Sequence, residues 1–375
     1  MKFVLSVFAL VIGALVVSAI KDEFSEECYT CCHNVSDGDQ KRSIQKLTTT
    51  IIGNVADSAI NVALSGPVLI IGGGSYDVDR AYQIGIDLER GCNTSNCAPK
   101  SDLTILRVTG SDAYNPSLLN LTGVDSVETL VMTKVTDANL ASVETKIKNS
   151  EWIFYAGGNQ CDYVTIFKGT KVDTATKFAA AHGATVGGSS AGAAILGEYI
   201  YDACKSSTGT TSIQALANPY DASISFTYGY NNFSYMNKVI TDQHFVARDR
   251  MGRLLSFMAR QIKDGKTISV WGVAVNEETA VVVNNVGLAT VVRNDGIFGG
   301  NPVPPASANP VAYVVLLDIA PTTCVTGSPL TASGYKVWKL LPGQTYNLAT
   351  RPTTGFSYTL NVTNGVVSSS SGSIY

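Results

Sequence analysis

Two adjacent serines stand among small residues in the stretch TVGGSSAGAAILG, residues 185–197. A serine nucleophile can occupy a sharp turn between a strand and a helix, where the positions two before and two after it must be small. Gly188 and Gly192 bracket Ser190 in this G-x-S-x-G register, whereas the neighbouring serine has no glycine two positions after it. The pattern predicts that Ser190 is a nucleophile. The alternative is a glycine-rich loop that packs a helix against a sheet.

A serine nucleophile needs a general base within hydrogen-bonding distance, and the chain has three histidines. His33 stands in a cysteine cluster. His182 ends a segment of helical composition, where capping or a favourable interaction with the helix dipole is the ordinary role. His244, in TDQHFVARDR, is therefore the best candidate by elimination, and the alternative is a hydrogen-bonded core histidine.

A carboxylate should fix the tautomer of the imidazole. Asp242 is two residues from His244, and side chains at that spacing on a strand share a face without meeting head-on. Glu277 and Glu278 interrupt the β-branched run VAVNEETAVVV. We interpret this run as one strand, so one glutamate should face solvent and the other should face inward, where a carboxylate needs a partner.

The elements that must position these residues alternate along the chain. Strand-like runs are PVLIIGGG, DLTILRVTG, VETLVMT, EWIFYAGGNQ and ATVGGSS; segments of helical composition are DVDRAYQIGIDLERG, NLASVETKIKNS and DTATKFAAAHG. This alternation predicts an α/β three-layer sandwich, a mainly parallel sheet with helices on both faces. The ends of its strands share one edge, where ligands bind in such folds. GGGSYD could cradle a phosphate, but it lacks the third glycine of the dinucleotide fingerprint, so no nucleotide cofactor is expected.

After the serine turn the character of the chain changes. VITDQHF is strand-like, RMGRLLSFMARQIKDG is a helix with an apolar face, and β-branched residues then predict further strands with an antiparallel part. The ending VVSSSSGSIY predicts a loose tail. We expect four segments: a signal peptide over 1–19, a cysteine-containing extension over 20–64, a catalytic domain over 65–320, and a β-rich extension and tail over 321–375.

The N-terminal sequence and the net charge indicate the compartment and the partners to expect for this protein. MKFVLSVFALVIGALVVSA has a charged start, an apolar run and small residues at its end, as in a secretory signal peptide cleaved after Ala19. The alternative is an uncleaved anchor, but the run is short and has no basic flank. The net charge of −3 gives no reason to expect nucleic acid or an anionic membrane as a partner. We expect a secreted protein without stable membrane insertion after cleavage.

Eight cysteines fit an oxidising compartment and suggest disulfides. Cys92 and Cys97 are close enough for a local bridge. CYTCCH, residues 28–33, leaves a zinc site as an alternative, whereas the haem pattern fails because Cys32 follows Cys31. The N-glycosylation triplets of a secreted glycoprotein stand at Asn34, Asn93, Asn120, Asn232 and Asn361.

Four stretches, FYAGGNQ, GGSSAGAAILG, DQHFVARDRMGRLL and GVAVNEETAVVV, occur in this order and together resemble cyanophycinase, in the S51 serine peptidases. The resemblance spans about residues 66 to 285. It implies a fold similar to class I glutamine amidotransferases, with serine in place of their cysteine and a triad in the order Ser, His, Glu. It implies that Ser190 is the nucleophile, His244 the base and Glu277 the orienting acid.

The resemblance also implies the remaining site residues. The backbone N–H groups of Gly158 and Ala191 match the oxyanion hole, and Asn159 departs from the commoner GGDQ of the family. No metal or cofactor is implied. Residues matching positions that contact substrate are Gln160, Asp242, Gln243, Arg248, Arg250 and Arg253.

We therefore expect a secreted serine peptidase that hydrolyses amide bonds in a peptide or polyaspartate-type substrate, with β-aspartyl (β-Asp-Arg) linkages preferred. Arginine grips carboxylates through paired hydrogen bonds, which suits aspartyl groups beside the scissile bond. The family is mostly bacterial and often intracellular, so the signal peptide and the extensions leave the natural substrate open. Two alternatives remain: a secreted non-catalytic binding protein of the same fold, and an α/β-hydrolase-type esterase with Asp202 or Asp221 as its acid. A homodimer is compatible with the sequence.

Overall fold

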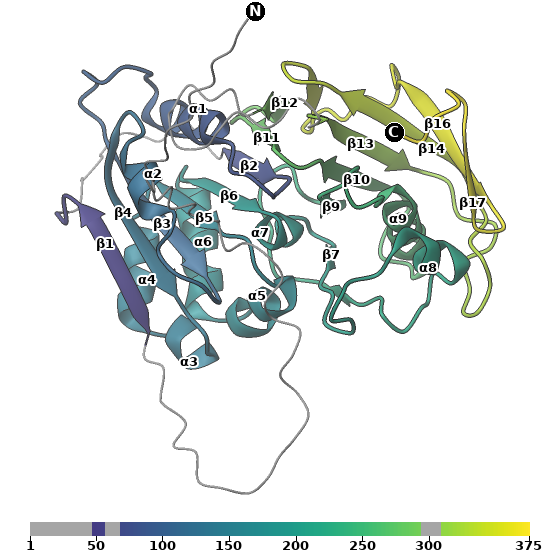
Figure 1. Cartoon of the computed structure of the whole chain (residues 1–375), viewed down its shortest axis with the longest axis horizontal. Coiled ribbons are helices and arrows are strands. Elements are labelled where there is room, and N and C mark those ends of the chain that lie inside the picture. Colours follow the sequence, from purple (N-terminus) through teal and green to yellow (C-terminus); the bar gives the residue numbers. More distant parts are fainter. Residues whose placement is uncertain (1–46, 57–67, 294–308) are drawn as a thin grey trace, which may run out of the picture. The chain divides into compact units, whose positions relative to one another are not determined.

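A nine-stranded central sheet has the strand order β1-β4-β3-β5-β6-β2-β11-β12-β15 in the computed structural model, which describes residues 47–56, 68–293 and 309–375 (Figure 1). Its five consecutive parallel strands are β4 (Val124–Val131), β3 (Ser101–Arg107), β5 (Trp152–Tyr155), β6 (Thr185–Ser189) and β2 (Leu69–Gly72). The predicted signal peptide, the CYTCCH cluster and the first glycosylation triplet lie outside the described residues.

Antiparallel strands extend the sheet on both sides. β1 (Thr48–Gly53), from the predicted N-terminal extension, pairs with β4. On the other side β2 is followed by β11 (Thr279–Val283), β12 (Leu288–Arg293) and β15 (Thr345–Asn347). The parallel part is therefore flanked by antiparallel pairs, and its strands end at a common edge.

Helices cover both faces of the parallel strands, because alternate residues of each strand point to opposite faces. Ile70 and Phe154 join a core with α1 (Asp79–Arg90) and α2 (Asn115–Leu119). Ile71 and Tyr155 join the opposite core. The helices of that face are α3 (Val135–Ala138), α4 (Ala141–Lys148), α5 (Gln160–Phe167), α6 (Lys171–Ala181) and α7 (Ala191–Ala194). The predicted three-layer α/β fold is confirmed.

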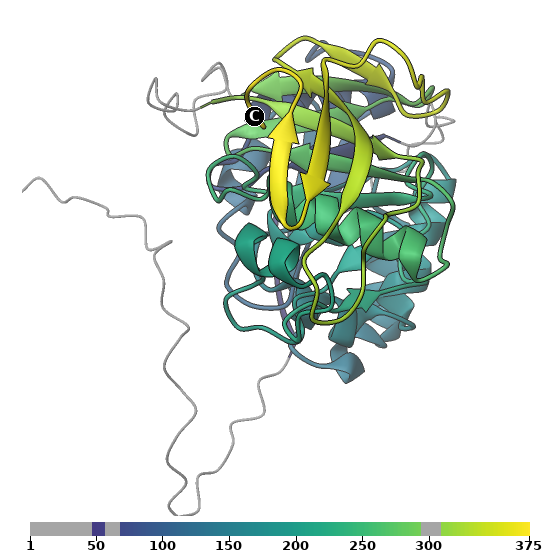
Figure 2. The ribbon, with the colours of Figure 1, turned by 90° about the vertical axis from the view of Figure 1, so that its right-hand side faces the viewer.

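A second, six-stranded sheet has the order β17-β16-β14-β13-β10-β9. β9 (Val239–Gln243) and β10 (Val270–Val275) pair in parallel. The antiparallel strands are β13 (Ala312–Leu317), β14 (Ala332–Leu340), β16 (Tyr358–Thr363) and β17 (Val366–Ser369). α8 (Ser212–Ala217) and α9 (Met251–Lys263) share a core with this sheet, whose C-terminal strands face the viewer in Figure 2. The short strands β7 (Ile200–Tyr201) and β8 (Phe226–Thr227) form a separate pair.

Two expectations about the second half of the chain are wrong. The run VAVNEETAVVV is not one strand, because β10 ends at Val275 in the second sheet and β11 begins at Thr279 in the first. Between them Glu278 has φ 58°, which turns the chain from one sheet to the other. The tail is not loose, because β17 pairs with β16 and the ring of Tyr375 packs against those of Phe245 and Tyr313.

Two disulfides are present. The predicted bridge Cys92–Cys97 is confirmed, and a second joins Cys161 to Cys204 across 43 residues. That separation gives no local signal in the sequence, so the second bridge was not predicted. Cys324 is buried and forms no disulfide within the described ranges. Over the same ranges, every helix is too short or too polar to cross a bilayer.

Candidate active site

Ser190 lies on a strained turn at the end of the central strand β6. It follows β6 directly, precedes α7, and has φ 52° and ψ −119°, a conformation that non-glycine residues rarely adopt. The glycines on either side are needed for space. A methyl group on Gly188 would lie 2.4 Å from the carbonyl of Gly192, and one on Gly192 would lie 1.9 Å from the carbonyl oxygen of Tyr155. The small residues thus allow a half-buried hydroxyl at the carboxyl edge of the sheet.

A chain of two hydrogen bonds links the predicted nucleophile, base and acid. The Oγ of Ser190 lies 2.8 Å from Nε2 of His244, and Nδ1 of the same ring lies 2.6 Å from Oε1 of Glu277. Because a carboxylate only accepts, Nδ1 carries the proton and donates it to Glu277, which leaves Nε2 free to accept from Ser190. The three side chains come from the ends of β6, β9 and β10, which the fold brings together.

Three consecutive glycine carbonyls hold the segments that carry these side chains. The carbonyl of Gly72 accepts from the N–H of Ser190 at 3.2 Å, and that of Gly73 accepts from the N–H of His244 at 2.8 Å. The carbonyl of Gly74 accepts from the N–H of Glu278, next to the predicted acid, at 3.1 Å. The carbonyl groups of the GGG run therefore position the three segments that form the site. Sequence reasoning weighed it only as a phosphate loop, although its position at the end of a strand was a usable signal.

The electrostatic environment favours a neutral imidazole in the resting site. Burial lowers the pKa of His244; the hydrogen bond to Glu277 raises it, and the guanidinium groups of Arg248 and Arg250 lower it further, so that the net shift is downward. The hydrogen bond from His244 is the main cause of a lowered pKa for Glu277. At neutral pH the pair is thus a neutral base beside an ionised carboxylate, as proton abstraction from a hydroxyl requires.

Two backbone N–H groups are available beside Ser190 for a developing oxyanion. Ala191 follows it as the first residue of α7, and Gly158 lies three residues after the end of the neighbouring strand β5, which runs parallel to β6. A methyl group on Gly157 would lie 3.7 Å from Cβ of Ser190, so the β5 end is close to the serine. Neither N–H group donates to an acceptor in the described part of the chain. Unpaired donors at this position can stabilise a tetrahedral intermediate.

The sequence comparison covers this same region. Residues 117–291, a little under half of the chain, match the model of peptidase family S51. The match supports an S51 serine peptidase. The matched segment includes Ser190, His244 and Glu277, the residues that the structure brings together.

The chain is also similar to solved structures. One is a peptidase from an acI-B1 Actinobacterium, with 13% identity, a TM-score of 0.48, and coverage of 76% of this chain and 98% of its own. Another is a candidate peptidase E protein from Listeria monocytogenes EGD-e, with 17% identity, a TM-score of 0.38, and coverage of 60% of this chain and 98% of its own. No curated protein matches the chain.

The residues that the S51 resemblance assigned to substrate contact separate into exposed and buried groups. The side chain of Arg248 is 56% exposed, and its Nε lies 3.8 Å from Oε1 of Glu277. Gln160 is half-buried at the start of α5, directly after the exposed Asn159. Arg250 is mostly buried and donates to the carbonyl of Gln243 at 2.7 Å. Arg248 and Gln160 are therefore the members of the set that a substrate can reach.

The structure buries the side chains of Asp242, Gln243 and Arg253. Arg253 donates to both carboxylate oxygens of Asp242, at 2.8 and 2.5 Å, and to the carbonyl of Thr210. Its guanidinium also lies 5.2 Å from the centre of the Tyr201 ring. A buried charge is stable only with such partners. Asp242 on β9 and Arg253 on α9 thus tie these two elements together through a buried ion pair.

The esterase alternative receives no support from the geometry. Asp202 accepts from the N–H of Cys204 and from the hydroxyls of Ser225 and Thr227. Asp221 accepts from the N–H and hydroxyl of Ser223. Both acids serve local turns, and the carboxylate that contacts the imidazole comes from Glu277, after His244 in the chain.

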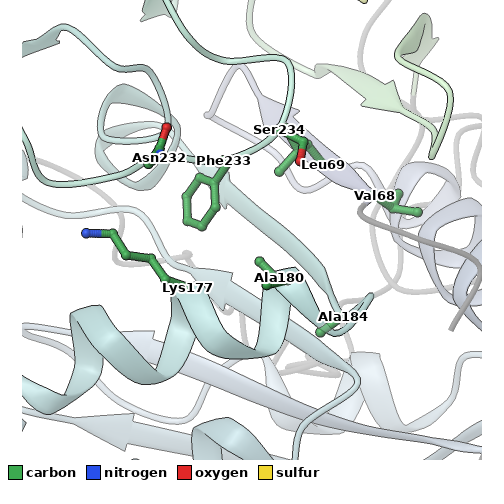
Figure 3. A pocket seen from close by; sticks show the side chains of 9 residues that line it. Val68, Leu69, Lys177, Ala180, Ala184, Asn232, Phe233 and Ser234 are labelled. Atoms are coloured by element: carbon green, nitrogen blue, oxygen red, sulfur yellow. The ribbon is translucent and has the colours of Figure 1, made fainter. Parts of the chain in front are cut away.

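Two further features of the described residues are their lack of a metal-binding cluster and one small pocket apart from the predicted site. Within the described ranges, His, Cys, Asp and Glu side chains form no cluster able to hold a metal ion. A small pocket of about 80 Å³ lies beside α6, between Lys177, Ala180 and Phe233 (Figure 3). None of the predicted site residues lines it, so it is not where a scissile bond would meet Ser190.

Proposed function

We propose that the protein is a serine peptidase in which Ser190, His244 and Glu277 form the catalytic triad. The observation that carries the proposal is the continuous hydrogen-bond chain from Glu277 through His244 to a serine held on a strained turn. A core histidine would need neither the strained serine nor the free N–H groups beside it.

The reaction follows from this geometry in two halves. The Oγ of Ser190 attacks the carbonyl carbon of the scissile amide while Nε2 of His244 takes the hydroxyl proton. The N–H groups of Ala191 and Gly158 then donate to the oxyanion. His244 returns the proton to the leaving amine, and the C–N bond breaks to leave an acyl-enzyme. Water repeats the sequence, with His244 as its base, and releases the acid and free Ser190.

We further propose that the substrate carries aspartyl carboxylates beside the scissile bond, as in the β-Asp-Arg units of cyanophycin. The exposed guanidinium of Arg248, next to Glu277, supports this substrate class because it stands at the mouth of the site. A guanidinium binds a carboxylate through two parallel hydrogen bonds. Asp242 and Arg253 no longer contribute to this argument, because they neutralise each other in the interior.

Secretion remains part of the proposal. The bridges Cys92–Cys97 and Cys161–Cys204 support an oxidising compartment. The glycosylation triplets within the described ranges present their asparagines on the surface, at Asn93, Asn120, Asn232 and Asn361.

A fluorophosphonate probe tests the chemistry without knowledge of the substrate. We expect stoichiometric labelling of folded protein, mapped to Ser190 by mass spectrometry of its peptides. Ser190→Ala should abolish labelling, and Ser189→Ala is the matched control that should retain it. Absence of labelling on folded wild-type protein would favour the non-catalytic binding protein.

Paired peptides test the substrate class. We expect hydrolysis of β-linked Asp-Arg peptides to be at least tenfold faster than that of α-linked Asp-Arg peptides of the same composition, the size of a single well-placed recognition contact. Similar rates for the two linkages would remove the β-aspartyl proposal and leave the serine mechanism intact.

A further inference from the structure

The turn between β9 and α9 carries the predicted base and has two strained positions. His244 has φ 49° and Asp249 has φ 46°, and both are non-glycine residues. Such conformations persist only where surrounding contacts hold them. The turn also carries Arg248, so its shape fixes both the proposed base and the proposed carboxylate-binding group.

α9 has no cap from its own sequence. Its N-cap residue is Arg250, which makes no side-chain capping hydrogen bond, and its first turn holds no acidic residue. Helix N-termini leave backbone N–H groups without intrahelical partners, and a side-chain oxygen usually accepts from one of them. The N–H of Met251 instead donates at 3.0 Å to the hydroxyl of Tyr375, which is 124 residues away.

Tyr375 contacts two residues of the turn and the first residue of α9. Its hydroxyl donates to Oδ1 of Asp249 at 2.8 Å while accepting from Met251. Its ring packs edge-on against Phe245, the residue after His244, with ring centres 5.9 Å apart. The segment that carries it is itself fixed, because the hydroxyl of Tyr358 on β16 donates to the carbonyl of Ile374 at 2.9 Å.

We infer that Tyr375 is a positioning residue for the site: it caps α9 from outside the helix and holds the turn 244–250 so that His244 and Arg248 keep their places. The inference rests on the proposed function for its kinetic consequence, but the ordering of the turn can be measured without any substrate. Sequence alone could not show it, because the contact joins segments that lie more than a hundred residues apart.

Tyr375→Phe is the decisive substitution, because it removes the hydroxyl and keeps the ring. We expect kcat/KM to fall about three- to tenfold, the effect of losing one or two hydrogen bonds at a helix end. The acid limb of its pH profile should move to higher pH, because a looser turn exposes the imidazole more. Amide hydrogen exchange over residues 249–254 should become faster. Tyr346→Phe is the matched control: it also loses a buried hydroxyl, which donates to the carbonyl of Pro352, and it should change none of these.

A double-mutant cycle tests whether Tyr375 acts on the turn through Asp249. Asp249→Asn keeps a residue type that tolerates positive φ and weakens the acceptor. If Tyr375 acts through Asp249, Tyr375→Phe should cost less in the Asp249→Asn background than in the wild type. Unchanged hydrogen exchange, kcat/KM and pH profile in Tyr375→Phe would overturn the inference. If the wild type shows no Ser190-dependent hydrolysis, the proposed function fails, and hydrogen exchange still decides whether Tyr375 orders the turn.

Discussion

Gly74 and His244 are in such close contact that the glycine has no room for a side chain. A methyl group on Gly74 would lie 2.5 Å from Cε1 and 2.6 Å from Nε2 of the imidazole. Gly74 also has φ +93°, a conformation that favours glycine. The loop after β2 therefore forms one wall of the site, and the backbone itself confines the ring on the side of its hydrogen bond to Ser190.

Gly74→Ala should reduce catalysis much more than stability. The new methyl group must displace the imidazole from Ser190, so we expect kcat/KM to fall by about 10²-fold or more, because small displacements of catalytic groups have effects of that order. Steady-state kinetics and probe labelling measure the loss. Gly91→Ala is the matched control, because that glycine also has positive φ (+65°) and has no atom within 4 Å of the added methyl group. Equal losses of activity in the two variants would show that backbone strain, and not contact with His244, is responsible.

Glu277→Gln should impair catalysis and change its pH dependence. An amide can donate to Nδ1 and favour the tautomer with a proton on Nε2, so we expect kcat to fall by roughly 10³- to 10⁴-fold, as for comparable triads. In the wild type, the lowered pKa of His244 places the acid limb of kcat/KM below the ordinary value of about 6.5. The hydrogen bond and charge of Glu277 raise that pKa, so their loss should move the acid limb to still lower pH.

Glu278→Gln tests which of the two adjacent glutamates orients the imidazole of His244. Its carboxyl is buried, and burial followed by the charge of Glu277 raises its pKa, but it makes no hydrogen bond to His244. We expect kcat within about threefold of the wild type, in line with a residue that does not contact the base. If Glu278→Gln were as damaging as Glu277→Gln, the assignment of the orienting acid would be wrong.

Arg253→Gln should reduce the stability of the protein, whereas Arg248→Gln should weaken substrate binding. Removing Arg253 takes two hydrogen bonds from the buried carboxylate of Asp242, although Arg250 remains 3.5 Å away. We expect a loss of up to about 3–5 kcal/mol in the free energy of unfolding, measured by denaturant titration. Arg248 is exposed, so its loss should change stability by less than about 0.5 kcal/mol and instead raise KM for β-aspartyl substrates. A stable, fully folded Arg253→Gln protein with a raised KM would restore Arg253 as a substrate contact.

Glu89→Gln should stabilise the protein at alkaline pH. Glu89 on α1 is fully buried, and burial raises its pKa well above the usual value, although hydrogen bonds from Ser101 and Thr185 act in the opposite direction. As the pH rises above about 4.5, the unfolded chain releases this proton before the folded chain does, so wild-type stability falls. The neutral glutamine removes this loss. The advantage of the variant should grow between pH 5 and pH 8 and reach about 1–3 kcal/mol, measured by denaturant titration at each pH. An advantage independent of pH would mean that Glu89 stays ionised in the folded state.

Much of the fold was predictable because its signals are local. Strand-like runs ending in glycine, separated by amphipathic segments, predicted the parallel strands and their covering helices, since side-chain periodicity follows from backbone geometry alone. The G-x-S-x-G spacing was informative for the same reason. Gly188 and Gly192 are two residues from Ser190, and the crowding that requires them lies within a single turn and the strand beside it.

Tertiary structure decided the features that depend on which segments meet. The apolar run around Glu277 and Glu278 fits one strand, but its halves join different sheets, and only that crossing turns Glu277 towards His244. Arg248 and Arg253 have the same charge five positions apart, yet one is exposed and the other is paired with Asp242. The three glycine carbonyls and the hydroxyl of Tyr375 act on segments distant in the sequence. Composition and spacing determine which chemistry a side chain can perform. Its charge state, pKa and partner depend on the neighbours that folding brings within a few ångströms. Those neighbours produce no periodic pattern in the sequence.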